Sequence, residues 1–288
     1  MTSKERIKAI EKKQAALAAK IKQAQEALYR LLLESIDRIE KDPAYVEQVF
    51  KKYQESAGMK LVTTIATDVA AISGYNYAYF LSFKDELNLS GKDFTKIKGT
   101  VDTFIQERIG LKGNKVIADS FLDTLLTDAT VKQKVKQQAY TNLLAGEGAT
   151  TFRKNIKSLV LGEGEKLGAL EAHYNTFVYD TYNQVDSALQ EQYSEELELT
   201  AFVYEGGLIS TSREFCKKKN GRVFLKEEAL KEWPKDPDLP KGGSAYRPLI
   251  DRGKFNCRHS INYLSSRRAM RLREDLEIVS GKLQVKSS

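Results

Sequence analysis

The stretch LELTAFVY (197–204) decides the fold, because it is the first segment with a clear strand pattern after a long helical region. It begins with apolar and polar residues in alternation and ends in aromatic and β-branched residues, as strands often do. Gly206-Gly207 then predicts a turn. RVFL (222–225) and CRHSINYL (257–264) predict two further strands. Together these segments indicate a small α+β module over residues 196–265.

A short helix and a helical turn are expected between these strands. Thr211 and Glu214 have the spacing of a capping box, which predicts the start of a helix, and Asn220-Gly221 predicts its end. Residues 226–233 predict a helical turn that carries Trp233 as an anchor of the core. A loop rich in proline and glycine follows over residues 234–248.

The chain before the module is predicted to be helical. Residues 1–42 are expected to form one long helix, because Ile10, Leu17, Ile21 and Leu28 recur at spacings of four and seven. Residues 43–195 predict a helical domain. Its Tyr-rich segment 75–83 alternates like a strand, but the context favours a helix. The predicted fold class is α+β, mostly α, with a large helical N-terminal region and a small C-terminal module.

Residues 266–288 predict a basic helical tail that Ser265 or Ser266 caps. Its clustered arginines are Arg267, Arg268, Arg271 and Arg273. Residues 251–288 hold 9 basic and 4 acidic side chains, and residues 1–60 hold 13 and 9. Two basic ends predict contact with double-stranded DNA or an acidic protein surface, and solvated helix faces are the alternative interpretation.

The composition excludes several classes of protein. The chain has 288 residues and a formal net charge of +7, with 30% charged and 41% hydrophobic residues, so it is neither disordered nor membrane-spanning in this interpretation. The charged start MTSKERIKAIEKKQ argues against a signal peptide. Two cysteines cannot build a disulfide scaffold, and they favour a reducing compartment.

A pattern of ten residues runs through the module in a fixed order. It comprises Tyr204, Gly206, Ser212, Arg213, Cys216, Gly221, Gly253, Cys257, Arg258 and His259. This pattern, with the helix that precedes it, resembles the C-terminal module of the phage Mu F-like and SPP1-type minor head proteins over about residues 165–265. No equally specific resemblance covers residues 1–160.

The resemblance implies a structural minor head protein, active in head morphogenesis of a tailed bacteriophage. Its expected partners are the portal and capsid proteins, its expected place is the head interior or portal vertex of the virion, and assembly would occur in the host cytoplasm. Several copies per virion and no membrane association are expected. The alternative is a DNA-binding cargo or ejection protein, and a metal-dependent enzyme is a third hypothesis.

Cys216, Cys257 and His259 are the candidate metal ligands. A helix packed over the strand would bring the three side chains together, and Asp251 or Glu214 could complete a zinc site. The alternatives are ordinary core side chains or a disulfide between the two cysteines.

Arg213 and Arg258 are expected to hold the loop through carboxylates such as Asp251, and phosphate contact is the alternative. The sequence has no P-loop, GxGxxG, HExxH or GxSxG motif, so we expect no catalytic residues.

Overall fold

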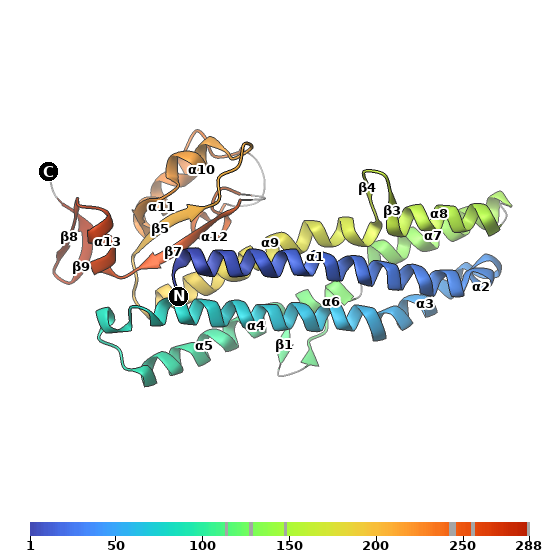
Figure 1. Ribbon diagram of the computed structural model, residues 1–288, viewed down its shortest axis with the longest axis horizontal. Coiled ribbons are helices and arrows are strands. Elements are labelled where there is room, and N and C mark those ends of the chain that lie inside the picture. The colour runs from blue at the N-terminus through green and yellow to red at the C-terminus, as the bar shows by residue number, and fades with distance from the viewer. Residues whose placement is uncertain (113–114, 127–128, 147–148, 242–245, 255–256, 287–288) are drawn as a thin grey trace. The chain divides into compact units, whose positions relative to one another are not determined.

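The computed structural model describes residues 1–112, 115–126, 129–146, 149–241, 246–254 and 257–286. The chain is mostly helical, with small antiparallel sheets, as the predicted fold class requires (Figure 1). Contacts group it into two compact units. The first comprises Met1–Glu11, Val69–Ile105 and Asp180–Ser288, and the second comprises Lys12–Asp68 and Gln106–Tyr179. The boundaries predicted at residues 42 and 195 do not coincide with this division.

The second unit is built almost entirely from helices. Its elements are the remainder of α1 (Ser3–Glu34), α2 (Ile36–Lys41), α3 (Val46–Tyr53), the first part of α4 (Met59–Leu81), the end of α5 (Gly91–Ile109), α6 (Phe121–Leu126), α7 (Ala129–Ala145), α8 (Ala149–Leu161) and the start of α9 (Ala169–Glu196). Short 3₁₀ and π turns at Pro43–Tyr45 and Gln54–Gly58 connect its early helices, and the hairpins β1–β2 (Leu111–Lys112, Lys115–Val116) and β3–β4 (Gly162–Glu163, Lys166–Leu167) connect the later ones.

The long first helix differs in one respect from the prediction. It is interrupted at Ser35, so the predicted segment 1–42 forms two helices rather than one. Leu17, Ile21 and Leu28 are buried, as their spacing predicts. The end at Asp42-Pro43 is confirmed: the Asp42 carboxylate accepts a hydrogen bond from the Ala44 amide (2.9 Å) and caps the next turn. The segment 75–83 is helical through Leu81, as its context predicted.

The first unit contains a three-stranded antiparallel sheet in the order β6-β5-β7, formed by Arg222–Leu225, Ala201–Gly206 and His259–Leu264 (Figure 1). The three predicted strands are therefore confirmed. Around the sheet lie α10 (Glu214–Lys219), α11 (Lys226–Glu232), a 3₁₀ turn (Trp233–Lys235) and α12 (Pro248–Asp251). The predicted capping box is wrong, because α10 begins after Arg213 without a side-chain cap and the Ser212 hydroxyl accepts from the Ile209 amide instead (2.8 Å).

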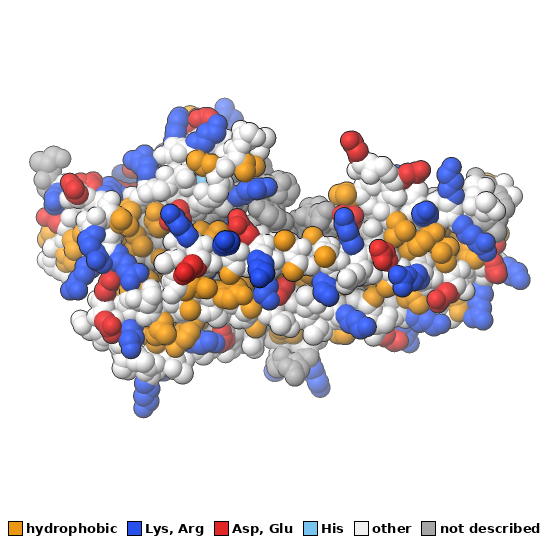
Figure 2. Space-filling model, viewed as in Figure 1, with side chains coloured by type: hydrophobic (Ala, Val, Ile, Leu, Met, Phe, Trp, Pro, Cys, Tyr) orange, Lys and Arg blue, Asp and Glu red, His pale blue; other side chains and the backbone are white. Residues whose placement is uncertain are grey.

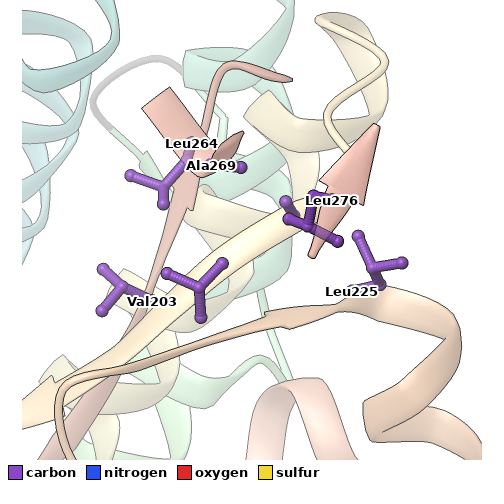
Figure 3. Close-up of a cluster of buried hydrophobic side chains, with 7 residues drawn as sticks. Val203, Leu225, Leu264, Ala269 and Leu276 are labelled. Carbon is purple, nitrogen blue, oxygen red and sulfur yellow. The ribbon is translucent and has the colours of Figure 1, made fainter. Parts of the chain in front are cut away.

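Alternation along β5 gives the sheet two different faces. Ala201 and Val203 face an aliphatic cluster that also contains Val223, Leu225, Leu264, Ala269 and Leu276 (Figure 3). Phe202 and Tyr204 face an aromatic cluster in which the Trp233 ring is 1% exposed. Side chains of successive strand residues point to opposite faces, so both faces of this small sheet are covered.

The C-terminal tail differs from the predicted helix. Helix α13 covers only Ser266–Leu272, and the Ser265 hydroxyl accepts from the Arg268 amide (3.2 Å), which confirms Ser265 as its cap. A hairpin follows, formed by β8 (Leu276–Val279) and β9 (Lys282–Val285). Ser280 and Gly281 turn it at positive φ (51° and 78°), which suits a two-residue hairpin turn. The Ser-Gly pair between two apolar runs was the sequence signal for this hairpin.

Candidate functional site

Cys216, Cys257 and His259 meet in the first unit, as the sequence predicted. Cys216 lies on α10, Cys257 lies in the segment before β7, and His259 opens that strand. The two sulfur atoms are 3.9 Å apart, and Nδ1 of His259 is 3.9 Å from the Cys257 sulfur. All three side chains are 2–4% exposed, and both cysteines are free thiols. The cluster is therefore enclosed by protein, and a substrate could reach it only after a movement of the chain.

Tyr204 completes the cluster from the central strand. Its hydroxyl oxygen lies 3.4 Å from the Cys216 sulfur and 3.3 Å from the Cys257 sulfur. Its ring stacks on the imidazole of His259, with centroids 4.9 Å apart and planes 4° apart. Sequence reasoning placed Tyr204 in the motif without a role. The structure brings its hydroxyl into contact with both thiols.

Of the two cysteines, Cys257 loses its proton more readily. The hydrogen bond from the Cys216 thiol lowers the pKa of Cys257, while the same bond raises the pKa of Cys216. Two neighbouring thiols lose their protons in sequence, and the first charge lies on the sulfur that receives more hydrogen bonds. Burial raises the pKa of Tyr204 well above its usual value, so its hydroxyl stays protonated and can donate to a thiolate.

Two positions of the motif require glycine, because neighbouring atoms lie too close to them for a Cβ. A Cβ on Gly206 would lie 2.5 Å from the Arg258 carbonyl oxygen and 2.6 Å from the His259 Cα, so a side chain there would push β7 away. A Cβ on Gly253 would lie 2.6 Å from the Cys216 sulfur and 3.1 Å from the Cys257 sulfur. The loop backbone thus forms one wall of the cluster.

Replacing Gly253 by alanine should lower the free energy of unfolding by about 1–3 kcal/mol, because the added methyl group overpacks the two sulfur atoms. Urea denaturation followed by Trp233 fluorescence measures the change. Gly207→Ala is the matched control, since a Cβ there meets no atom within 4 Å. Equal midpoints for the two variants would show that the loop does not press on the sulfurs.

The two arginines of the motif, Arg213 and Arg258, differ in their contacts. The Arg213 guanidinium donates to the carbonyl oxygen of Gly253 (3.0 Å), which holds the loop as predicted but through a backbone acceptor. Arg258 is exposed and has no carboxylate partner among the described residues. Asp251 accepts from the Arg247 amide (2.7 Å), and Glu214 pairs with Lys217 (2.7 Å). Within the described ranges, neither carboxylate joins the ligand atoms of the cluster, which corrects their proposed role as a fourth ligand.

Arg252 was missed by sequence reasoning. It is buried at positive φ (52°), and its guanidinium donates to the carbonyl oxygen of His259 (2.6 Å). Positive φ costs a non-glycine residue free energy, so its contacts must hold it there. No local pattern marks such a residue, because the contact crosses from the loop to β7.

Most of the tail arginines are paired within the chain. Arg268 and Arg271 contact the Glu86 carboxylate (3.0 and 3.3 Å), and Arg273 makes a bidentate pair with Glu228 (2.6 and 2.8 Å). Arg267 is exposed. Figure 2 shows the Lys and Arg side chains of one face dispersed among acidic and neutral ones. Three of the four arginines thus have carboxylate partners before any external anion binds.

A second buried polar cluster surrounds Arg6, which sequence reasoning also missed. Its fully buried guanidinium contacts the Asp186 carboxylate and the side-chain oxygen of Asn262. Asn76 donates to the same carboxylate (3.0 Å) and accepts from Gln190 (2.7 Å). Burial lowers the pKa of Arg6 to about 10, so it remains charged at neutral pH. This network connects the first residues of the chain to α4, α9 and β7.

No helix in the described part of the chain has both the length and the apolar character to cross a membrane. Comparison with protein-family models, with curated proteins and with solved structures finds no match.

Proposed function

We propose that this protein is a structural component of a tailed-phage head that acts in head morphogenesis beside the portal and capsid proteins. One observation supports the proposal above the others. The residues on which the resemblance rests lie as far apart in the chain as Tyr204 and His259, yet most of them meet around one buried cluster. A chance match would not be expected to select residues that pack together. A structural reason for the motif in this chain strengthens the argument from the motif.

The buried cluster fits a structural role better than catalysis. A Cys-His nucleophile needs an orienting group and access for a substrate. Here the imidazole is 2% exposed, and within the described ranges no carboxylate joins the sulfur and nitrogen atoms. In the proposed role the first unit is a rigid block, and the helical second unit offers exposed surface for docking.

Co-expression with the portal protein of the same phage, followed by affinity pull-down at low and high salt, tests the proposal. The full chain should co-purify with the portal protein at both salt concentrations. A variant that lacks residues 1–40 would not test portal binding. Arg6 and Leu17 are buried, so we expect this deletion to unfold the chain. Absence of portal binding by the folded full chain would contradict the proposal.

A DNA-binding cargo or ejection protein is the second candidate, and the basic ends of the chain favour it. Its binding to duplex DNA would fall steeply with salt, since it would rest on phosphate contacts. Arg267→Glu separates the two functions. It should weaken DNA retention if the tail contacts phosphate, and it should leave portal binding unchanged, because Arg267 is exposed on α13.

A further inference from the structure

We propose that Cys216, Cys257 and His259 form a binding site for a borderline-soft divalent metal ion, Zn²⁺ in the first instance. The site lies in the first unit and does not depend on the proposed role in head assembly. It would join three segments of the module: helix α10, the segment before β7 and the first residue of β7.

The distance between the two sulfurs matches the coordination of zinc, and the imidazole nitrogen would have to move slightly closer to them. A Zn–S bond of about 2.3 Å in a tetrahedral site places two sulfur ligands about 3.8 Å apart. The sulfurs of Cys216 and Cys257 are 3.9 Å apart, and Nδ1 of His259 is 3.9 Å from the Cys257 sulfur. The three ligand atoms all lie within 4.8 Å of one another. The Tyr204 hydroxyl oxygen lies 3.3–3.4 Å from both sulfurs and can donate a hydrogen bond to a coordinated thiolate.

The imidazole supplies an independent observation. His259 is 2% exposed, yet its Nε2 has no hydrogen-bond partner among the described residues. Among the described residues, its ring nitrogens make one weak contact, from Nδ1 to the Cys257 sulfur at 3.9 Å. A buried imidazole normally has a partner for its ring nitrogens, because burying a polar group without one costs free energy. A metal ion bound at Nδ1, the nitrogen beside the Cys257 sulfur, would replace this weak contact with a coordinate bond.

The surroundings hold the ligands in place, as outer-shell residues do in metal sites. Arg252 donates to the backbone carbonyl of His259 (2.6 Å), and Arg213 donates to that of Gly253 (3.0 Å). Gly253 leaves room beside the sulfurs that any side chain would fill. Binding would release the proton of each coordinating thiol to solvent, and Zn²⁺ with two thiolates carries no net charge.

Metal analysis of the full chain tests the site. Protein purified with a phosphine reductant from zinc-supplemented cells should carry about one Zn²⁺ per chain. Cys257→Ser and His259→Gln should weaken binding by more than the roughly 10–100-fold that loss of an outer-shell partner costs. His173→Gln is the matched control, because His173 is the only other histidine in the chain, and it should retain the metal.

Cobalt titration of the unmodified chain keeps the test independent of the variants' folding. Co²⁺ bound by thiolates gives an intense charge-transfer absorption, which Zn²⁺ should then displace, and a chelator should lower the unfolding temperature. The proposal is overturned if folded, reduced protein shows no such absorption. It is also overturned if the Cys257→Ser variant binds Zn²⁺ as tightly as the unmodified chain while its Trp233 fluorescence shows that it is folded.

Discussion

Replacing Arg6 by alanine is expected to lower the free energy of unfolding of the first unit by about 3–5 kcal/mol. The substitution leaves the Asp186 carboxylate buried without its cation, and it removes the hydrogen bond that the guanidinium donates to the side-chain oxygen of Asn262. An uncompensated buried charge costs more than the intact pair contributes. Urea denaturation followed by the fluorescence of Trp233, which lies in the same unit, measures the loss.

Lys8→Ala is the matched control for this prediction. Lys8 is exposed on the same helix, so its replacement should change the free energy by no more than about 0.5 kcal/mol. The double variant Arg6→Met with Asp186→Leu should recover part of the loss, because apolar residues of similar volume replace a buried pair at low cost. If Arg6→Ala and Lys8→Ala have the same stability, the first residues are not anchored in the core.

Replacing Trp233 by alanine should also cost about 3–5 kcal/mol, because it opens a cavity in the aromatic face of the sheet. The indole contacts four rings edge to face: those of Phe202, Tyr204, Phe215 and Phe224, at centroid distances of 5.3–5.7 Å. Such pairs add to the free energy of burying the rings themselves. Because Trp233 is the only tryptophan, unfolding of this variant is followed by far-ultraviolet circular dichroism.

Two further variants test the reason for that loss. Trp233→Phe should be less destabilising than Trp233→Ala, since it keeps an aromatic ring and loses no hydrogen bond from the indole nitrogen, which has no partner within the described residues. Leu230→Ala is the control on α11, where Leu230 is 51% exposed, and it should be close to neutral. A small effect of Trp233→Ala would mean that the ring is not part of the core.

Local patterns were sufficient for several parts of the first unit. The strands at 201–206, 222–225 and 259–264 follow from β-branched and aromatic runs between turn residues. The Ser265 cap follows from its position before a helical segment. The meeting of Cys216, Cys257 and His259 was also predicted, because a helix packed on a strand brings such residues together.

The errors arose where two patterns competed or where a signal was overlooked. Clustered arginines led to the prediction of a helical tail, although Leu276–Val279 and Lys282–Val285 flank a Ser-Gly turn and form a hairpin. The capping-box spacing of Thr211 and Glu214 was equally misleading, because Ser212 bonds to Ile209 and α10 starts later.

The sequence by itself determined the elements that depend on neighbouring residues: the helices with their buried stripe, the three strands and the cap at Ser265. Only the tertiary structure decided which distant groups meet. It placed Arg6 against Asp186, 180 residues away, Arg252 against the carbonyl of His259, and Gly253 against both sulfurs. Helix and strand patterns reflect periodic burial along the chain, whereas a buried charge is stable only when remote partners surround it, and no local spacing encodes those partners.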